Sequence, residues 1–211
     1  IKPEIFEPGA PVKTEAVLGW WDHGRRDLPW RRTRDPWAVL VSEVMLQQTQ
    51  VSRVVPKWHA FLDRYPDPVA CAVAPPGAVI EAWAGLGYNR RGVALHRCAQ
   101  VVTDEHGGRL PADLRALLAL PGIGPYTARA VLAFAFEEDV AVLDTNVARV
   151  VARQAGRPLR PAEAQAAADA LVPPGEGWAW NQAMLDLGAQ VCRARDPRCA
   201  DCPVRASCAW R

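Results

Sequence analysis

Lysine is scarce in this chain of 211 residues. Of its 25 basic residues, only Lys2, Lys13 and Lys57 are lysines. The formal net charge is +2, and so small an excess does not by itself indicate a polyanionic partner. The other basic residues are arginines, which gather at 25–34 and again at 90–97. Arginine suits bidentate phosphate contacts and ring stacking better than lysine does. Each arginine taken singly also fits a solvated helix face, so nucleic acid stays open as a partner.

The features of a membrane or secreted protein are also missing. No apolar run is long enough to span a bilayer, and the N-terminal stretch has neither the basic start nor the apolar centre of a signal peptide. We therefore expect a cytoplasmic protein with no membrane partner.

Sustained alternation of apolar and polar residues, the pattern of a half-buried strand, is absent as well. Helical periodicity dominates instead, and proline and glycine punctuate it, as in the Pro173-Pro174-Gly175 loop. The helical pattern covers segments 15–26, 36–65, 76–88, 93–107, 111–122 and 161–172. The sequence predicts an all-α fold, long enough for one large domain or two small ones with a proper core.

Cysteine is rare until the last twenty residues, where it becomes the strongest signal in the chain. Only Cys71 and Cys98 precede that segment, which then carries a C-x6-C-x2-C-x5-C pattern formed by Cys192, Cys199, Cys202 and Cys208. Four thiolates in one short loop indicate a soft metal centre, and metal-ligating thiolates favour a reducing compartment. Zinc ribbons usually present two C-x2-C knuckles, whereas the wider gaps here favour an iron-sulfur cluster. Zinc or disulfides remain the alternatives.

A second signal lies at 120–128, where an apolar helix is expected to end at Leu120-Pro121. Gly122, Ile123 and Gly124 then form a hairpin, and Pro125 opens a second helix at the position where its missing N–H costs nothing. Backbone N–H groups at that helix N-terminus form a phosphate grip that ignores base sequence. Ile123 is the expected apolar peg between the helices. The alternative is a tight helix corner with no ligand.

Two carboxylates are candidates for chemistry. Asp144 is placed to cap the helix that ends before Gly156, and a carboxylate held there stays ionised and can stabilise a nearby cation. Glu43 lies in an otherwise apolar helix. Taken alone it reads as a surface residue, but partial desolvation would raise its pKa and suit it to act as a general acid.

Together these residues carry a family resemblance. The segments SEVMLQQTQ (42–50), GLGY (85–88), LPGIGPYTA (120–128) and LDTNV (143–147), with the cysteine loop, resemble the helix-hairpin-helix (HhH-GPD) DNA glycosylases that carry a 4Fe-4S cluster. Within them the chain looks most like the catalytic part of the MutY type of adenine glycosylase. The resemblance runs from about Trp20 to Cys208.

The resemblance implies two helical modules flanking a DNA-binding cleft: a six-helix barrel with the helix-hairpin-helix at 31–137, and an iron-sulfur cluster module formed by 1–30 plus 138–211. It also implies a set of site residues. They are Glu43, Tyr126, Asp144 and Asn146 for catalysis; Trp30, Arg31, Leu46 and Gln182 for the base pocket; Gln48 and Tyr88 for the wedge into the duplex; Thr49 and Leu86 for the opposite base; Gly122, Ile123 and Gly124 for the phosphate-binding hairpin; and Cys192, Cys199, Cys202 and Cys208 for the 4Fe-4S cluster.

The implied activity is hydrolysis of the N-glycosidic bond of a base flipped out of double-stranded DNA, namely adenine mispaired with 8-oxoguanine or guanine. Family members that also cut the strand carry a lysine where this chain has Tyr126, so we expect a monofunctional enzyme. The resemblance also implies a monomer that is associated with the nucleoid. The cluster is expected to order a loop whose Arg193, Arg195, Arg198 and Arg205 face phosphate.

Two alternatives stay open. Asn89 and Thr145 depart from residues common in MutY proteins, which leaves a glycosylase for T or U opposite G, or for 5-methylcytosine, as the alternative substrate class. Pyrimidines lack N7, so Glu43 could not act on them as that acid. A non-catalytic iron-sulfur DNA-binding protein is the alternative of a different class, although it would not need Glu43 together with Asp144 and Tyr126.

Overall fold

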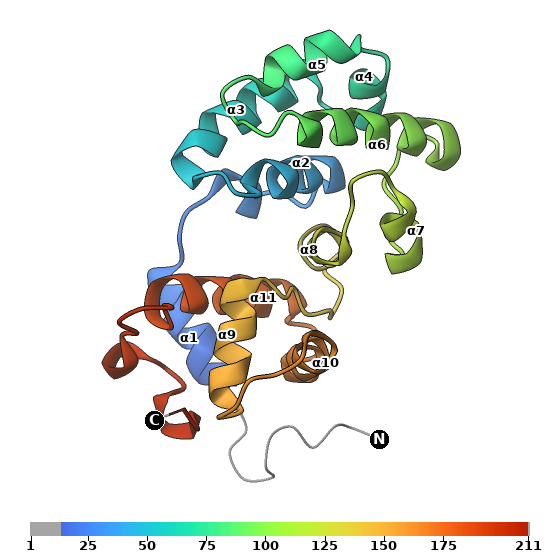
Figure 1. Ribbon diagram of the computed structural model, residues 1–211. Helices are drawn as coiled ribbons and strands as arrows, with labels where there is room; N and C mark the ends of the chain where they lie inside the picture. Colours follow the sequence, from blue (N-terminus) through green and yellow to red (C-terminus); the bar gives the residue numbers. More distant parts are fainter. Residues whose placement is uncertain (1–13, 211) are drawn as a thin grey trace. The chain divides into compact units, whose positions relative to one another are not determined.

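The computed structural model describes residues 14–210, and these contain helices and no strand (Figure 1). The all-α fold predicted from the helical periodicity is confirmed. None of the described helices has the length and apolar character needed to cross a membrane. The chain forms two compact units. We call Asp27–Phe136 the continuous unit, and the described residues up to Arg26 together with those from Glu137 onward the split unit.

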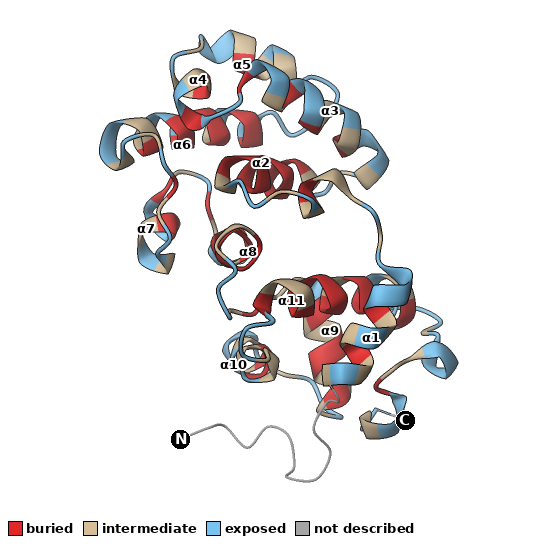
Figure 2. Cartoon of the chain, turned by 180° about the vertical axis from the view of Figure 1, so that it is seen from behind, coloured by how far each residue is buried: buried red, intermediate tan, exposed pale blue. Residues whose placement is uncertain are grey.

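The continuous unit contains one short 3-10 helix and seven α-helices. They are η1 (Pro29–Arg31), α2 (Pro36–Leu46), α3 (Val51–Arg64), α4 (Pro68–Ala72), α5 (Pro76–Trp83), α6 (Arg90–His106), α7 (Leu114–Ala119) and α8 (Pro125–Ala135). Helix α2 is central, because it packs against α8 on one side and against α3 and α6 on the other (Figure 1). Every residue from Trp37 to Met45 is buried, as Figure 2 shows.

Aspartate and proline start these helices. Asp35, Asp67 and Asp113 accept hydrogen bonds from the N–H of the third residue of α2, α4 and α7 respectively. Proline occupies the first turn of α2, α4, α5 and α8, where its fixed φ favours the helix and no N–H partner is lost. These local signals explain why proline and glycine in the sequence mark the helix ends.

The helical pattern expected over 36–65 is interrupted in the structure. Helix α2 ends at Leu46 and α3 begins at Val51, with a loop at 47–50 between them. Gln48 in this loop has φ 56°, in the left-handed region. Apolar periodicity alone did not show this interruption, because the residues on both sides of the loop face the same core.

The split unit contains α1 (Thr14–Gly24), α9 (Thr145–Gln154), α10 (Pro161–Leu171), α11 (Gly177–Asp186), the π-helical turn η2 (Leu187–Val191) and the 3-10 turns η3 (Cys199–Asp201) and η4 (Arg205–Ser207). Helix α1 packs against α11 although the two are far apart in sequence. Asp186, fully buried, accepts from Trp21 Nε1 at 3.0 Å and from Arg26 Nε at 2.7 Å. This carboxylate attaches the N-terminal helix to the unit.

Candidate functional site

Asp144 is the N-cap of α9, as the sequence predicted. The Val147 N–H donates to its Oδ1 at 2.7 Å, and Asn146 Nδ2 donates to its Oδ2 at 2.8 Å. Asn146 Oδ1 in turn accepts from Arg149 Nη2 at 2.8 Å. Arg149 also donates to the carbonyls of Cys192 and Gly188, each at 2.8 Å. Both carboxylate oxygens are therefore held by donors, and a hydrogen-bonded chain connects Asp144 to the start of the cysteine loop.

The segment leading to Asp144 is anchored by buried side chains. Asn181 on α11 accepts from the Val142 N–H at 2.7 Å and donates to the Val140 carbonyl at 2.8 Å. Asp169 accepts from the Ala141 N–H at 3.0 Å. Because three successive residues before the cap are fixed in this way, the position of Asp144 does not depend on a free loop.

Glu43 lies on α2 with 6% of its surface exposed. The interpretation of Glu43 as a surface residue is therefore wrong, because every residue of α2 from Trp37 to Met45 is buried, including Glu43. Tyr126 lies in the first turn of α8, the helix that packs against α2, and is half-buried. Glu43 and Tyr126 thus belong to the continuous unit, whereas Asp144 and Asn146 belong to the split unit.

Three of the four expected base-pocket residues belong to the continuous unit. Trp30 is buried in η1 and meets Trp58 edge to face, with ring centroids 6.1 Å apart. Arg31 follows it in the same turn, and Leu46 is the last residue of α2, one helical turn beyond Glu43. Gln182 is buried on α11 in the split unit.

The four residues expected at the wedge and opposite base come from two loops that the fold brings together. Thr49 Oγ1 donates to the Leu86 carbonyl at 3.3 Å, which joins the loop at 47–50 to the loop at 84–89. Gln48 and Tyr88 are exposed, and both have positive φ, at 56° and 48°. The sequence motifs did not show that the two loops touch.

The expected hairpin is present between α7 and α8. Gly122 has φ 78°, and a Cβ there would lie 2.7 Å from the Ala94 Cβ, so the turn requires glycine. Ile123 is buried, in agreement with its predicted role as an apolar peg. Gly124 is the N-cap of α8 and has no side chain with which to cap that helix end.

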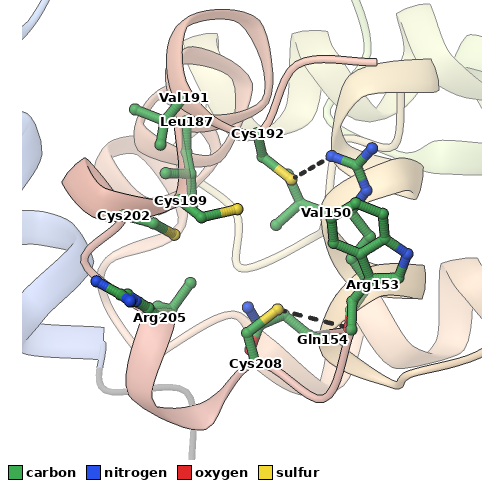
Figure 3. A pocket seen from close by; sticks show the side chains of 12 residues that line it. Val150, Arg153, Gln154, Leu187, Val191, Cys192, Cys199, Cys202, Arg205 and Cys208 are labelled. Carbon is green, nitrogen blue, oxygen red and sulfur yellow. Dashed lines mark hydrogen bonds between the residues drawn. The ribbon is translucent and has the colours of Figure 1, made fainter. Parts of the chain in front are cut away.

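The four clustered cysteines line one cavity of about 430 Å³ in the split unit. Figure 3 shows their sulfur atoms turned toward a common space whose walls include Val150, Leu187 and Val191. Within residues 14–210, no three His, Cys, Asp or Glu side chains converge closely enough to hold a single metal ion. The thiols surround a volume and do not meet at a point, an arrangement that fits a multi-iron cluster better than one tetrahedral zinc ion.

The electrostatics of this cavity disfavour a free thiolate at Cys202. Burial raises the pKa of the Cys202 thiol, the Val204 N–H lowers it, and the neighbouring Cys192, Cys208 and Cys199 raise it further. Four thiolates in an apolar cavity would repel each other unless a metal centre neutralised them. Arg153 supplies one positive contact, because its Nη1 donates to Cys192 Sγ at 3.3 Å while its guanidinium lies 4.2 Å from the Trp210 ring centroid.

The arginines of the cysteine loop are all exposed, namely Arg193, Arg195, Arg198 and Arg205. Arg193 donates to the Asp196 carbonyl at 2.7 Å, and Arg198 forms an ion pair with Asp201 at 3.1 Å. These contacts occupy part of their donor capacity within the loop itself.

The described residues thus combine an all-helical fold, a glycine hairpin before α8, an aspartate that caps α9, and four thiols around one cavity. The model of the HhH-GPD superfamily base excision DNA repair proteins matches residues 41–174. An adenine DNA glycosylase of Mycolicibacterium smegmatis is 48% identical over 92% of this chain and 68% of its own length. One from Mycobacterium tuberculosis is 46% identical over 100% of this chain and 71% of its own length.

Among solved structures, a thermostable thymine-DNA glycosylase superposes with a TM-score of 0.88 at 31% identity, covering 93% of this chain and 94% of its own. The chain belongs to the HhH-GPD superfamily of base excision DNA repair proteins, and it is a DNA glycosylase.

Proposed function

We propose that this glycosylase releases adenine from a mispair in double-stranded DNA. The observation that carries the proposal is the pair of carboxylates: Glu43 is buried in α2, and Asp144 is held through both oxygens, in a chain 48% identical to an adenine DNA glycosylase. One buried acid and one fixed anion are what cleavage of an N-glycosidic bond needs.

In the proposed reaction Glu43 donates a proton to N7 of the flipped adenine. The bond between C1′ and N9 then breaks, and its electron pair leaves with the neutral purine. The deoxyribose becomes oxocarbenium-like, and Asp144 stabilises its positive charge. Water adds to C1′, and its proton passes to the Glu43 carboxylate, which restores the acid. Asn146 holds Asp144 in place, and Tyr126 is assigned to orient the reacting groups.

The remaining expected residues are proposed as substrate contacts. Trp30, Arg31, Leu46 and Gln182 surround the extruded base, and Gln48 with Tyr88 fills the gap left in the stack. Thr49 and Leu86 face the opposite base, and the hairpin at Gly122–Gly124 binds phosphate through backbone N–H groups.

We further propose that Cys192, Cys199, Cys202 and Cys208 hold a 4Fe-4S cluster. When bound, the cluster would neutralise the thiolates and hold the loop of Arg193, Arg195, Arg198 and Arg205 for phosphate contact. Base release itself is assigned to the two carboxylates and not to the cluster. Purified protein should contain iron and acid-labile sulfide in about equal amounts and absorb visible light, whereas a colourless protein with stoichiometric zinc contradicts the assignment.

The substrate is tested with duplexes that carry A opposite 8-oxoguanine, A opposite G, T or U opposite G, and 5-methylcytosine, followed by alkaline cleavage of abasic sites. We expect cleavage at adenine only. Release of pyrimidines alone would assign the chain to the thymine branch that the 31% identical structure represents.

The catalytic role of Asp144 is tested with Asp144→Asn. The amide keeps the size of the side chain and an acceptor for the Val147 N–H but cannot stabilise a cation, so base release should fall by about 100-fold or more while DNA binding persists. Unchanged base release would favour a different catalytic anion.

Borohydride should trap no amine-linked adduct, because Tyr126 offers no amine.

A further inference from the structure

Each of the two loops assigned to the wedge contains a non-glycine residue with positive φ. Among the described residues, only Gln48, Tyr88, Glu137 and Asp196 are non-glycine residues with positive φ. Two of these four are the residues at the tips of the loops at 47–50 and 84–89. Such conformations persist only where the surrounding structure over-determines them, and they gather at functional sites. Some contact must therefore hold both loops.

Arg91 makes that contact. It is 8% exposed, and its Nη1 donates to the carbonyls of Val44 at 2.9 Å and Met45 at 3.1 Å. A further bond to the Gln47 carbonyl fixes the first residue of the loop at 47–50. Its Nη2 donates to Thr49 Oγ1 at 3.0 Å in that loop. The same Nη2 donates to the carbonyls of Leu86 at 3.3 Å and Gly87 at 3.1 Å in the other loop.

The guanidinium also lies beside both aromatic rings of the second loop region, with its Cζ 5.5 Å from the Tyr88 ring centroid and 5.6 Å from that of Trp83. Within residues 14–210, every hydrogen-bond acceptor found for Arg91 is a neutral oxygen. The carbonyls of Val44 and Met45 in the last turn of α2, and of Gln47 just after it, carry the negative end of the helix dipole and so replace a carboxylate partner. Burial lowers the pKa of Arg91.

We propose that Arg91 is a positioning residue that clamps the two wedge loops together in the strained geometry that base extrusion requires. The proposal rests on the proposed glycosylase function and adds to it, because Arg91 touches neither of the catalytic carboxylates. Lysine cannot replace arginine here, since a single ammonium has three donors and no planar fork to reach acceptors in two loops.

The clamp is tested first without DNA, by hydrogen exchange of the wild type, Arg91→Lys, Arg91→Met and the control Arg90→Met. Arg90 is the exposed neighbour of Arg91 on the same helix and is not part of the clamp. In both Arg91 variants, the amides of 47–50 and of 84–89 should exchange about tenfold faster or more, while those of the buried part of α2 stay protected. Faster exchange in only one loop, or no change, overturns the proposal.

Base extrusion is then measured with 2-aminopurine placed beside a target adenosine that 2′-fluorination makes resistant to cleavage. The fluorescence rise that reports unstacking should fall about tenfold in Arg91→Lys, with DNA affinity changed by less than about threefold. Arg90→Met should retain the full rise. Extrusion at the wild-type level in Arg91→Lys overturns the proposal.

The two proposals fail in different ways. If the wild type releases no adenine, the proposed substrate is wrong, yet the coupled loosening of both loops still decides whether Arg91 is the clamp. If the wild type releases adenine and Arg91→Lys extrudes and releases it equally well, the clamp is wrong and the glycosylase assignment stands.

Discussion

Asn146 is a single residue whose hydrogen bonds hold a catalytic candidate, Asp144, in place. Its amide donates to Asp144 Oδ2 at 2.8 Å, and its carbonyl oxygen accepts from Arg149 at 2.8 Å. Asn146→Ala removes both bonds but leaves the Val147 N–H on Asp144. We expect kcat for base release to fall roughly 10-fold to 100-fold, because a catalytic group held less firmly loses orientation.

The control for Asn146 is Thr145→Ala at the exposed neighbouring position. Single-turnover assays should show normal chemistry for this variant. A loss of activity equal to that of Asn146→Ala would point to damage to the N-terminus of α9 and not to misplacement of Asp144.

The six cysteines should differ in reactivity. Burial raises the pKa of Cys71 and Cys98 from 9.0 to about 12. A thiol is nucleophilic as its anion, so both should resist iodoacetamide in the folded protein up to at least pH 9. Mass spectrometry of protein stripped of metal should show alkylation at the four clustered cysteines first. Early modification of Cys71 or Cys98 contradicts their burial in the folded unit.

The role of a residue could be predicted from the sequence where it depends on adjacent residues, as in helix capping. It could not be predicted where it depends on helices from elsewhere in the chain. Asp144 precedes a helical segment and was predicted as its cap, which the structure confirms. Glu43 was ambiguous, because its burial depends on helices from elsewhere in the chain. Arg91 and Asp186 gave no signal, since a buried charge looks like a surface charge until its partners are known.

Among the elements, helix starts were the most predictable feature. Aspartate before proline marks α2 and α4 through purely local contacts. The break at 47–50 was missed, because the apolar pattern continues on both sides of it and its contacts to Arg91 come from a distant helix. Helix α11, which follows the Pro173-Pro174-Gly175 loop, was not distinguished either, since it is buried on several sides and lacks a clear amphipathic pattern.

The hairpin between α7 and α8 offers a matched pair of substitutions. Gly122→Ala should destabilise the continuous unit by about 1–3 kcal/mol, because it combines positive φ with a clash against Ala94. Gly124→Ala should change stability by less than about 0.5 kcal/mol, since no atom lies within 4 Å of the added Cβ and its φ is −95°.

Thermal unfolding measures the change in stability that each glycine substitution causes. DNA affinity is measured separately, as a test of phosphate binding at the hairpin. If phosphate approaches the backbone at this turn, Gly124→Ala weakens DNA binding without loss of stability. Unaltered affinity would favour the hairpin as a helix corner with no ligand.

For the whole molecule, the division into two units predicts which helices lose protection when the cysteine cavity is altered. Cys202→Ser removes one thiolate from the cavity, which α9, η2 and the cysteine loop surround. We expect faster hydrogen exchange in these elements and unchanged protection in α2, α6 and α8, because the continuous unit has its own core. Equal loosening of both units would show that the cavity supports the entire fold.

Asp186 gives the matching test for the attachment of α1. Asp186→Ala should lower the unfolding free energy of the split unit by about 2 kcal/mol, less than the 3–5 kcal/mol typical of a broken buried pair, because 39% of the Arg26 side chain stays exposed. Urea unfolding, followed by a spectroscopic signal from the surroundings of Trp21, should show this loss of unfolding free energy. Asp186→Asn, which retains an acceptor, should lose less.

The attachment of α1 to α11 also determines the order in which the two units can fold during synthesis. Trp21 and Asp186 are separated by 165 positions, so α1 leaves the ribosome on the order of ten seconds before its partner helix is made. During that interval the continuous unit can fold alone, whereas the apolar face of α1 at Val17 and Trp21 has no native surface to cover it. Assembly of the split unit, with its long loop closure, is therefore the late step of biosynthesis and the one at which a chaperone would bind.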